Sequence, residues 1–153
     1  MKIAIGSDEL AFEMKETIKK FLQEQTEIAI ESIKDCGVNS GETADYPDVA
    51  EKVARSIMSG ECDRGILVCG TGIGMAIAAN KFPGIRAAQV YDPYSAERSR
   101  KSNDAQIMTM GALTMGMETA KYLVGIWLQC EFAGGRSARK VDKINAIDQQ
   151  FRK

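Results

Sequence analysis

The chain has 153 residues, of which 44% are hydrophobic and 27% are charged, and its formal net charge is −1. This length is typical of one domain, and this composition favours neither a disordered chain nor a surface that binds nucleic acid. We therefore expect a single domain over residues 1–153 that binds a small molecule, with no nucleic-acid or membrane partner.

The apolar runs are short, and the N-terminal "MKIAIGSDEL" reaches an acidic residue too early for a signal peptide or a membrane span. The four cysteines have neither CxxC spacing nor the density of a disulfide scaffold, so we expect reduced thiols in a cytoplasmic protein. There is no histidine, which removes the commonest metal ligand and the commonest acid–base group. We expect no metal and no cofactor.

Strand and helix patterns alternate from the start of the chain. Residues 2–6 form a short apolar run typical of a buried strand, and apolar residues then recur at helical spacing over residues 10–22. Residues 28–33 indicate a second strand that leads into a glycine-containing loop. Residues 46–60 are typical of a helix, with Pro47 in its first turn.

The second half of the chain continues this alternation. Strands and helices are expected in turn over residues 65–69, 72–80, 85–90, 92–102, 107–110 and 115–130. The pattern predicts an α/β fold: a Rossmann-like, doubly wound sheet of five parallel strands in a three-layer αβα arrangement. In such folds the site lies at the carboxyl ends of the strands.

The last segment, residues 135–153, is a basic amphipathic pattern with Val141, Ile144 and Ile147 at helical spacing. Two interpretations stay open. The segment is either a dimerisation helix that packs on a partner subunit, or a solvated helix on the same domain.

The stretch "ILVCGTGIGM" places Cys69 at the end of a strand, directly before a turn that contains Gly70, Gly72 and Gly74. The glycines do not match GxGxxG, because Met75 stands where the last glycine belongs, so a dinucleotide fingerprint is not supported. Backbone N–H groups converge in such a turn, and the dipole of the following helix favours negative charge. The turn therefore suits an oxyanion.

A cysteine beside a helix N-terminus can act as a thiolate base or nucleophile near neutral pH, although buried cysteines often only fill space. Thr71 adds a hydroxyl donor to the turn, and Asp8 follows the first strand at the same edge of the sheet. Taken singly, Thr71 and Asp8 are better explained by a turn or cap role than by catalysis.

Five segments together resemble the ribose-5-phosphate isomerase B and galactose-6-phosphate isomerase family, over nearly the whole chain. They are "MKIAIGSD", "ADYPDVAEKVA", "GILVCGTGIGMAIAANKFPGIRAA", "YSAERSRKSNDAQIMTMGA" and "GGRSARKV". The resemblance implies metal-free interconversion of phosphorylated aldoses and ketoses through an enediolate. It also implies a homodimer or homotetramer with sites shared between subunits.

The resemblance also implies roles for individual residues. The cysteine that matches Cys69 is the base that carries a proton between C1 and C2, and the matching glycine turn holds the enediolate oxygens with Thr71. Arg136 and Lys140 match two arginines that reach the substrate phosphate, often from the neighbouring subunit; lysine lacks the bidentate fork of arginine. The positions that match contacts to the sugar are Asp8, Tyr46 and Asn103.

Three positions depart from the family, which usually has histidine where this chain has Glu9, Ser102 and Ser137. The first histidine normally helps to bind phosphate, and a carboxylate there repels a dianion, so either Glu9 turns away or the phosphate lies elsewhere. The second histidine, at the position of Ser102, normally opens the furanose ring.

A four-carbon sugar esterified at O4 cannot close a furanose ring, so it needs no ring-opening group. The segments "KSNDAQ" and "GRSAR" also resemble those of family members that act on erythrulose and erythrose 4-phosphates. This favours a tetrose phosphate. Ser102 could instead position a water molecule, or Tyr46 could help to open a pentose ring.

Three hypotheses for function remain. The first is an aldose–ketose isomerase that uses Cys69 as its base. The second is a non-catalytic phosphate-ligand-binding or supporting subunit of a hetero-oligomeric isomerase, suggested by the missing histidines. The third, a flavodoxin-like or nucleotide-binding module, rests on fold analogy alone.

Overall fold

The computed structural model describes residues 1–152 and contains one sheet of five strands in the order β2-β1-β3-β5-β4. Every neighbouring pair of strands is parallel. The expected alternation of strands and helices is therefore confirmed. The strands are β1 (Lys2–Ser7), β2 (Ser32–Asp35), β3 (Arg64–Cys69), β4 (Ala87–Gln89) and β5 (Ile107–Gly111).

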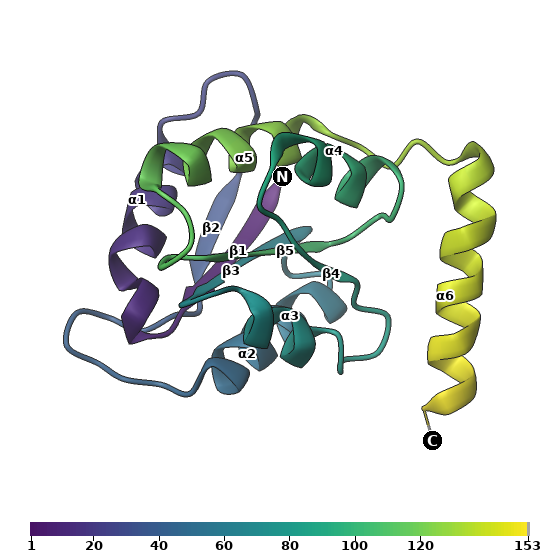
Figure 1. Ribbon diagram of the computed structural model, residues 1–153, viewed down its shortest axis with the longest axis horizontal. Coiled ribbons are helices and arrows are strands. Elements are labelled where there is room, and N and C mark those ends of the chain that lie inside the picture. Colours follow the sequence, from purple (N-terminus) through teal and green to yellow (C-terminus); the bar gives the residue numbers. More distant parts are fainter. Residues whose placement is uncertain (153) are drawn as a thin grey trace.

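Helices cover both faces of the sheet, which confirms the Rossmann-like, three-layer prediction. Figure 1 shows α1, α4 and α5 on one face and α2 and α3 on the other. No helix within residues 1–152 is long and apolar enough to cross a membrane. The helices are α1 (Phe12–Gln23), α2 (Tyr46–Met58), α3 (Ile73–Ala79), α4 (Pro93–Lys101), α5 (Met117–Gln129) and α6 (Ala138–Phe151), with short 3-10 turns η1 (Glu9–Ala11) and η2 (Gly135–Ser137).

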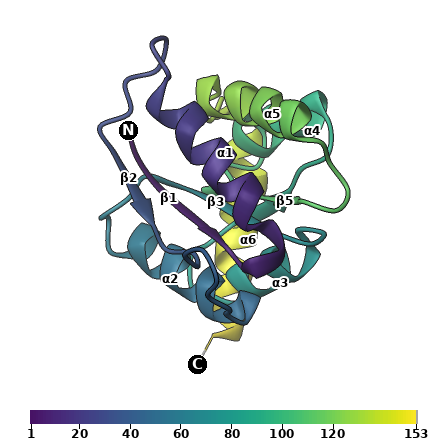
Figure 2. The ribbon, with the colours of Figure 1, turned by 90° about the vertical axis from the view of Figure 1, so that its left-hand side faces the viewer.

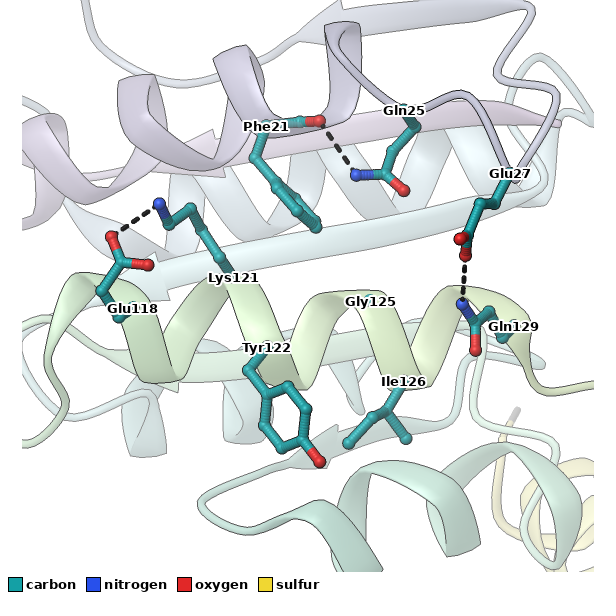
Figure 3. Close-up of a pocket in the computed structure, with 9 residues that line it drawn as sticks. All are labelled: Phe21, Gln25, Glu27, Glu118, Lys121, Tyr122, Gly125, Ile126 and Gln129. Carbon is teal, nitrogen blue, oxygen red and sulfur yellow. Dashed lines mark hydrogen bonds and ion pairs between the residues drawn. The ribbon is translucent and has the colours of Figure 1, made fainter.

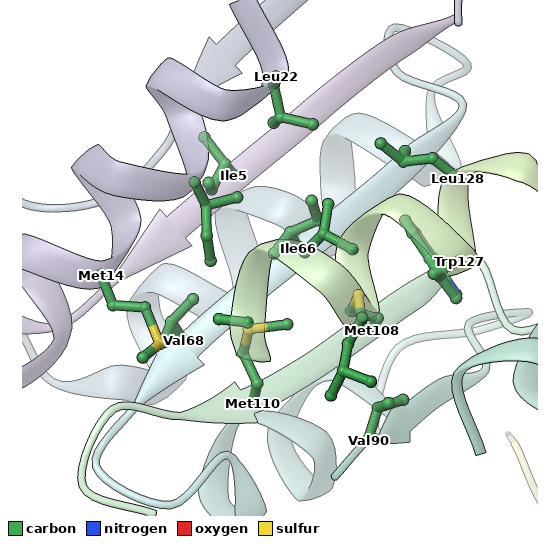
Figure 4. Close-up of a cluster of buried hydrophobic side chains, with 14 of the residues drawn as sticks. Ile5, Met14, Leu22, Ile66, Val68, Val90, Met108, Met110, Trp127 and Leu128 are labelled. Carbon is green, nitrogen blue, oxygen red and sulfur yellow. The ribbon is translucent and has the colours of Figure 1, made fainter. Parts of the chain in front are cut away.

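Each face of the sheet has its own apolar core, because successive side chains of a strand point to opposite faces. Ile66 and Val68 of β3 pack in the core under α1 and α5, together with Trp127 (Figure 4). Leu67 and Cys69, the alternate residues, pack in the core under α2 and α3. The alternation therefore turns the Cys69 side chain toward the layer that contains α3.

The second strand lies later in the chain than the sequence pattern indicates. Residues 28–33 were expected to form it, whereas β2 covers Ser32–Asp35. Its register gives the reason: β1 begins at Lys2, and Lys2 pairs with Ser32. Ile28 and Ile30 pack against the core from the connecting segment, which explains their apolar pattern without a strand.

A fully buried lysine anchors the loop that leads into α2. Lys15 Nζ donates to Asp35 Oδ2 at 2.8 Å and to the carbonyl of Val38 at 2.8 Å. Burial raises the pKa of Asp35, but hydrogen bonds from Lys15 and Lys19 outweigh this effect and lower it below its ordinary value. The charge-assisted bonds hold the loop against α1, and Tyr46 begins the helix that follows the loop.

The last helix, α6, stands beside the domain on the side where α4 ends, and Figure 2 shows it behind the sheet. Two hydrogen bonds connect it to the segment before β4: Arg86 donates to Asn145 at 2.9 Å, and the Gly84 N–H donates to Asp148 at 2.8 Å. The apolar residues Ile144, Ile147 and Phe151 remain exposed. Lys153, the last residue of the expected 135–153 segment, lies outside the described residues.

Candidate active site

The thiol of Cys69 lies where β3 ends and the glycine turn begins. The Gly72 N–H donates to Cys69 Sγ at 3.1 Å, and Cys69 is only 5% exposed. The positive end of this N–H dipole is directed at the sulfur, so it stabilises negative charge there. The sequence predicted this pairing of a thiol with backbone amides.

The glycine turn packs tightly against the end of β5, where close approach excludes side chains. Gly72 has φ +79°, and a Cβ atom there would lie 2.8 Å from the carbonyl carbon of Met110. A Cβ atom on Gly111 would lie 2.6 Å from Thr71. Thr109 Oγ1 donates to the Gly72 carbonyl at 2.9 Å, which fixes the turn from beneath. Only glycine combines this conformation with this contact.

The turn keeps several donors available for a ligand. The Ile73 N–H donates to Thr71 Oγ1 at 3.3 Å. The N–H groups of Gly70, Thr71 and Gly74 form no hydrogen bond within residues 1–152. Such unpaired donors at the start of a helix can bind an oxyanion.

Three further predicted residues lie on the same edge of the sheet. Asp8 caps η1 by accepting from the Ala11 N–H at 3.3 Å, and burial raises the pKa of its carboxyl group. The ring of Tyr46 covers the α-carbon of Gly74, since a Cβ there would lie 2.7 Å from the ring. Glu9 accepts from the Ala44 N–H at 3.3 Å, so its carboxylate is turned toward the loop before α2.

The remaining predicted residues lie elsewhere, at the junction of α4 with α6. Ser102, Arg136 and Lys140 line one cavity of about 720 Å³. Its other lining residues are Arg98, Gly135, Ser137 and Arg139. Asn103 follows Ser102 directly, and its carbonyl accepts from Arg86 Nε at 3.2 Å.

The fold sets a minimum distance between these two groups of residues. Cys69 pairs with Gly111 at one end of β5, and Gly65 pairs with Ile107 at the other. These pairs lie four residues apart, or about 13 Å along the strand. Because β4 and β5 are parallel, α4 leads from the carboxyl edge of the sheet back to the amino edge, where Ser102 and Asn103 precede β5. Within one chain, the cavity beside Ser102 and the thiol therefore lie at opposite edges of the sheet.

Exposed apolar side chains surround the Cys69 turn. Leu10 is 62% exposed and Leu113 is 72% exposed, and both lie within 3.6 Å of the position of a Cβ on Gly70. Ile73, the first residue of α3, is 48% exposed. We call Leu10, Ile73 and Leu113 the apolar rim. Exposed apolar side chains grouped in this way are typical of surfaces that bind another molecule.

A separate hollow of about 460 Å³ lies between α1 and α5 (Figure 3). Its polar side chains are bonded among themselves: Lys121 pairs with Glu118 at 2.6 Å, and Gln129 donates to Glu27 at 3.2 Å. It contains none of the predicted site residues, so it offers no comparable chemistry.

Sequence reasoning missed Arg98 and Arg139 of the cavity and Leu10 and Leu113 of the rim. A signal was present for Arg98, because it precedes Ser102 by four residues on one helix and therefore shares its face. For the leucines no local signal existed, since they come together only through the fold.

A parallel α/β sheet with a thiol and unpaired amides at its carboxyl edge is typical of a Rossmann-like domain that binds its ligand at that edge. Residues 3–144 match the Ribose/Galactose Isomerase family. The chain therefore belongs to the ribose/galactose isomerase family and is a sugar-phosphate isomerase. This assignment replaces the alternatives of a non-catalytic subunit and a nucleotide-binding module.

Individual relatives agree with this assignment. The chain is 55% identical over 152 residues to ribose-5-P isomerase B of Listeria innocua, covering 99% of this chain and 100% of that protein. It is 49% identical over 150 residues to D-erythrulose-4-phosphate isomerase of Pectobacterium atrosepticum, covering 98% of this chain and 97% of that protein. The solved structure of Clostridium thermocellum ribose-5-phosphate isomerase B matches with a TM-score of 0.93 at 45% identity. The match covers 99% of this chain and 100% of that chain.

Gly72→Ala tests the close contact between the glycine turn and β5. Gly60→Ala is the matched control, because Gly60 also has positive φ (+74°) but has nothing within 4 Å of a new Cβ. We expect Gly60→Ala to lower the free energy of unfolding by about 1–2 kcal/mol, the cost of the left-handed conformation. Gly72→Ala should cost about 1–3 kcal/mol more, because the new atom overlaps Met110. Equal losses in urea unfolding would contradict the packing argument.

Proposed function

We propose that this enzyme interconverts a phosphorylated aldose and its ketose through an enediolate, with Cys69 as the base. The observation that carries the proposal is the Gly72 N–H directed at Cys69 Sγ, beside the unpaired N–H groups of the same turn. A base and an oxyanion site are the two devices that this reaction requires.

The proton transfer uses the sulfur in both directions. In the ketose-to-aldose direction, the thiolate of Cys69 takes a proton from C1, and the electron pair of the broken C–H bond forms the C1–C2 double bond. The negative charge moves to the carbonyl oxygen at C2, where Thr71 and the N–H groups of Gly70 and Gly74 stabilise it. The thiol then returns the proton to C2, while the hydroxyl proton passes from O1 to O2. No atom is gained or lost.

The phosphate is bound by Arg136 and Lys140 of a second copy of the chain. Within one chain Cys69 lies at the carboxyl edge of the sheet and the cation cavity lies toward the amino edge, and the paired part of β3 and β5 between these edges is about 13 Å long. A two-fold partner places the cation cavity of each chain against the thiol of the other. We infer a homodimer, alone or within a homotetramer, in which the partner covers the apolar rim and α6 (Ala138–Phe151) is the dimerisation helix.

The substrate is a tetrose phosphate such as erythrulose or erythrose 4-phosphate. Ser102 is the residue that supports this choice. A phosphate on O4 leaves no hydroxyl to close a five-membered ring, so no ring-opening group is needed at the position of Ser102. Glu9 is bonded to the Ala44 N–H rather than presented to a phosphate. The Pectobacterium relative is named for erythrulose 4-phosphate, and the Listeria relative for ribose 5-phosphate.

The reaction needs a reduced sulfur at position 69. We propose that the enzyme works in the cytoplasm, where thiols stay reduced. All four cysteines are free. In this proposal, Asp8, Tyr46 and Asn103 contact the sugar hydroxyls. Asp8 and Tyr46 lie on the same edge of the sheet as the Cys69 turn, and Asn103 directly follows Ser102 of the cation cavity.

The proton-transfer role of Cys69 is tested by isotope exchange. In deuterated water, we expect the unmodified enzyme to introduce deuterium at C1 or C2 of its substrate. Cys69→Ala should reduce the exchange rate by about 10²- to 10⁴-fold with the fold retained, because the base is lost. Cys62→Ala, at a buried cysteine outside the site, should leave exchange unchanged. Undiminished exchange in Cys69→Ala would remove the thiol from the mechanism.

The substrate is tested by rates on erythrose 4-phosphate, ribose 5-phosphate and allose 6-phosphate, measured side by side. We expect the highest kcat/KM for the tetrose. Ser102→His should then raise the ribose 5-phosphate rate relative to the tetrose rate, because an acid–base group for ring opening is added. A large preference of the unmodified enzyme for the pentose would overturn the four-carbon assignment and leave the isomerase mechanism intact.

The shared site is tested by complementation. Cys69→Ala and Arg136→Ala should each be nearly inactive alone. After co-refolding in equal amounts, we expect about a quarter of the unmodified activity, because half of the dimers are mixed and each mixed dimer has one intact site. Cys69→Ala mixed with Thr71→Ala, two changes in the same half, should restore nothing. Failure of the first mixture to recover, with mixed dimers present, would place both halves in one chain.

A further inference from the structure

The cavity at the junction of α4 and α6 carries more positive charge than Arg136 and Lys140 supply. Arg98 and Arg139 also line it, and none of its seven lining residues is acidic. Within residues 1–152, Arg136, Arg139 and Lys140 take part in no ion pair. Uncompensated cations around one cavity attract an anion of high charge.

Arg98 approaches the cavity from a different wall than the other cations. It lies on α4, one turn before Ser102, so the two residues share a helix face. Arg136, Arg139 and Lys140 belong to η2 and the first turn of α6. An anion in the cavity therefore has Arg98 on the α4 side and the remaining cations on the α6 side.

The guanidinium of Arg98 retains capacity for a ligand. Its terminal nitrogen pairs with Glu97 at 3.1 Å, and its charged group lies over the Tyr94 ring at 5.9 Å. Its Nε–H is buried and has no partner within residues 1–152, so the protein does not satisfy every donor of this guanidinium. The side chain as a whole is 36% exposed.

We propose that Arg98 is a phosphate-binding residue, which contacts the substrate phosphate from α4 while Arg136 and Lys140 contact it from α6. This inference rests on the proposed function, because the phosphate is taken to be that of the substrate. A planar guanidinium binds two phosphate oxygens at once, which the ammonium group of Lys140 cannot do. Glu97 competes with the phosphate for the same guanidinium.

The test measures binding of inorganic phosphate by calorimetry at low ionic strength, and KM and kcat for the sugar phosphate. Arg98→Gln should weaken phosphate binding and raise KM by about tenfold or more, with kcat nearly unchanged, because a charge-assisted contact is lost. Arg98→Lys should give a smaller loss, since it keeps the charge without the fork. Glu97→Gln should tighten phosphate binding, because it releases the guanidinium.

Arg55→Gln is the matched control. Arg55 is an exposed arginine on α2 that is paired with Glu51, and it does not line the cavity. It should leave phosphate affinity unchanged, although the net charge changes equally. An equal loss in both variants would reduce the effect to net charge and overturn the assignment of Arg98. An unchanged phosphate affinity in Arg98→Gln, or a loss of kcat alone, would also overturn it.

The measurements distinguish a failure of the proposed function from a failure of the inference about Arg98. If the unmodified protein turned over no sugar phosphate, the isomerase proposal would fail, while the phosphate titrations would still decide whether Arg98 binds the anion. If the unmodified protein were active and Arg98→Gln bound phosphate normally, only the inference about Arg98 would fail.

Discussion

The length of a parallel sheet separates the two halves of this enzyme's chemistry. The thiol of Cys69 lies at the carboxyl end of β3, and the cationic cavity lies beyond the amino end of β5. Because β3 and β5 are paired in register, the two edges of the sheet lie about 13 Å apart. In the proposed reaction, a substrate with a reacting carbon at one end and a phosphate at the other therefore needs two copies of the chain. The exposed apolar rim and the cations of the cavity are the two halves of that proposed interface.

Near the thiol of Cys69, backbone N–H groups supply the positive electrostatic potential. Because Gly72 of the turn and Gly111 of β5 lack side chains, the turn packs close enough to β5 to direct one N–H at the sulfur and leave others unpaired. These dipoles are fixed by the fold before the substrate arrives, so the proposed movement of charge from sulfur to sugar oxygen needs little reorganisation. The absence of histidine is compatible with the proposed mechanism, in which the amides supply the stabilisation and the sulfur is the base.

Much of this arrangement follows from the sequence. Alternating apolar runs predicted the parallel sheet, and the position of Cys69 before three glycines predicted the thiol and its amides. The position of β2 did not follow, because Ile28 and Ile30 pack against the core without a strand partner, and only the register of Lys2 with Ser32 shows where pairing begins. The hydrogen bond from Ala44 to Glu9 and the approach of Arg98 to Arg139 join residues distant in the chain. Periodicity describes faces of single elements, so it could not predict these contacts.

The most direct test of the two-chain site is a crystal structure with a phosphorylated three-carbon hydroxamate. Its nitrogen takes the place of C1 of a tetrose, so it is a stable mimic of the enediolate. We expect Cys69 Sγ and the turn amides of one chain at the hydroxamate end, and Arg136 and Lys140 of the partner at the phosphate end of the same molecule. A ligand whose two ends are both held by a single chain, or whose phosphate lies away from the α4–α6 cavity, would contradict the account.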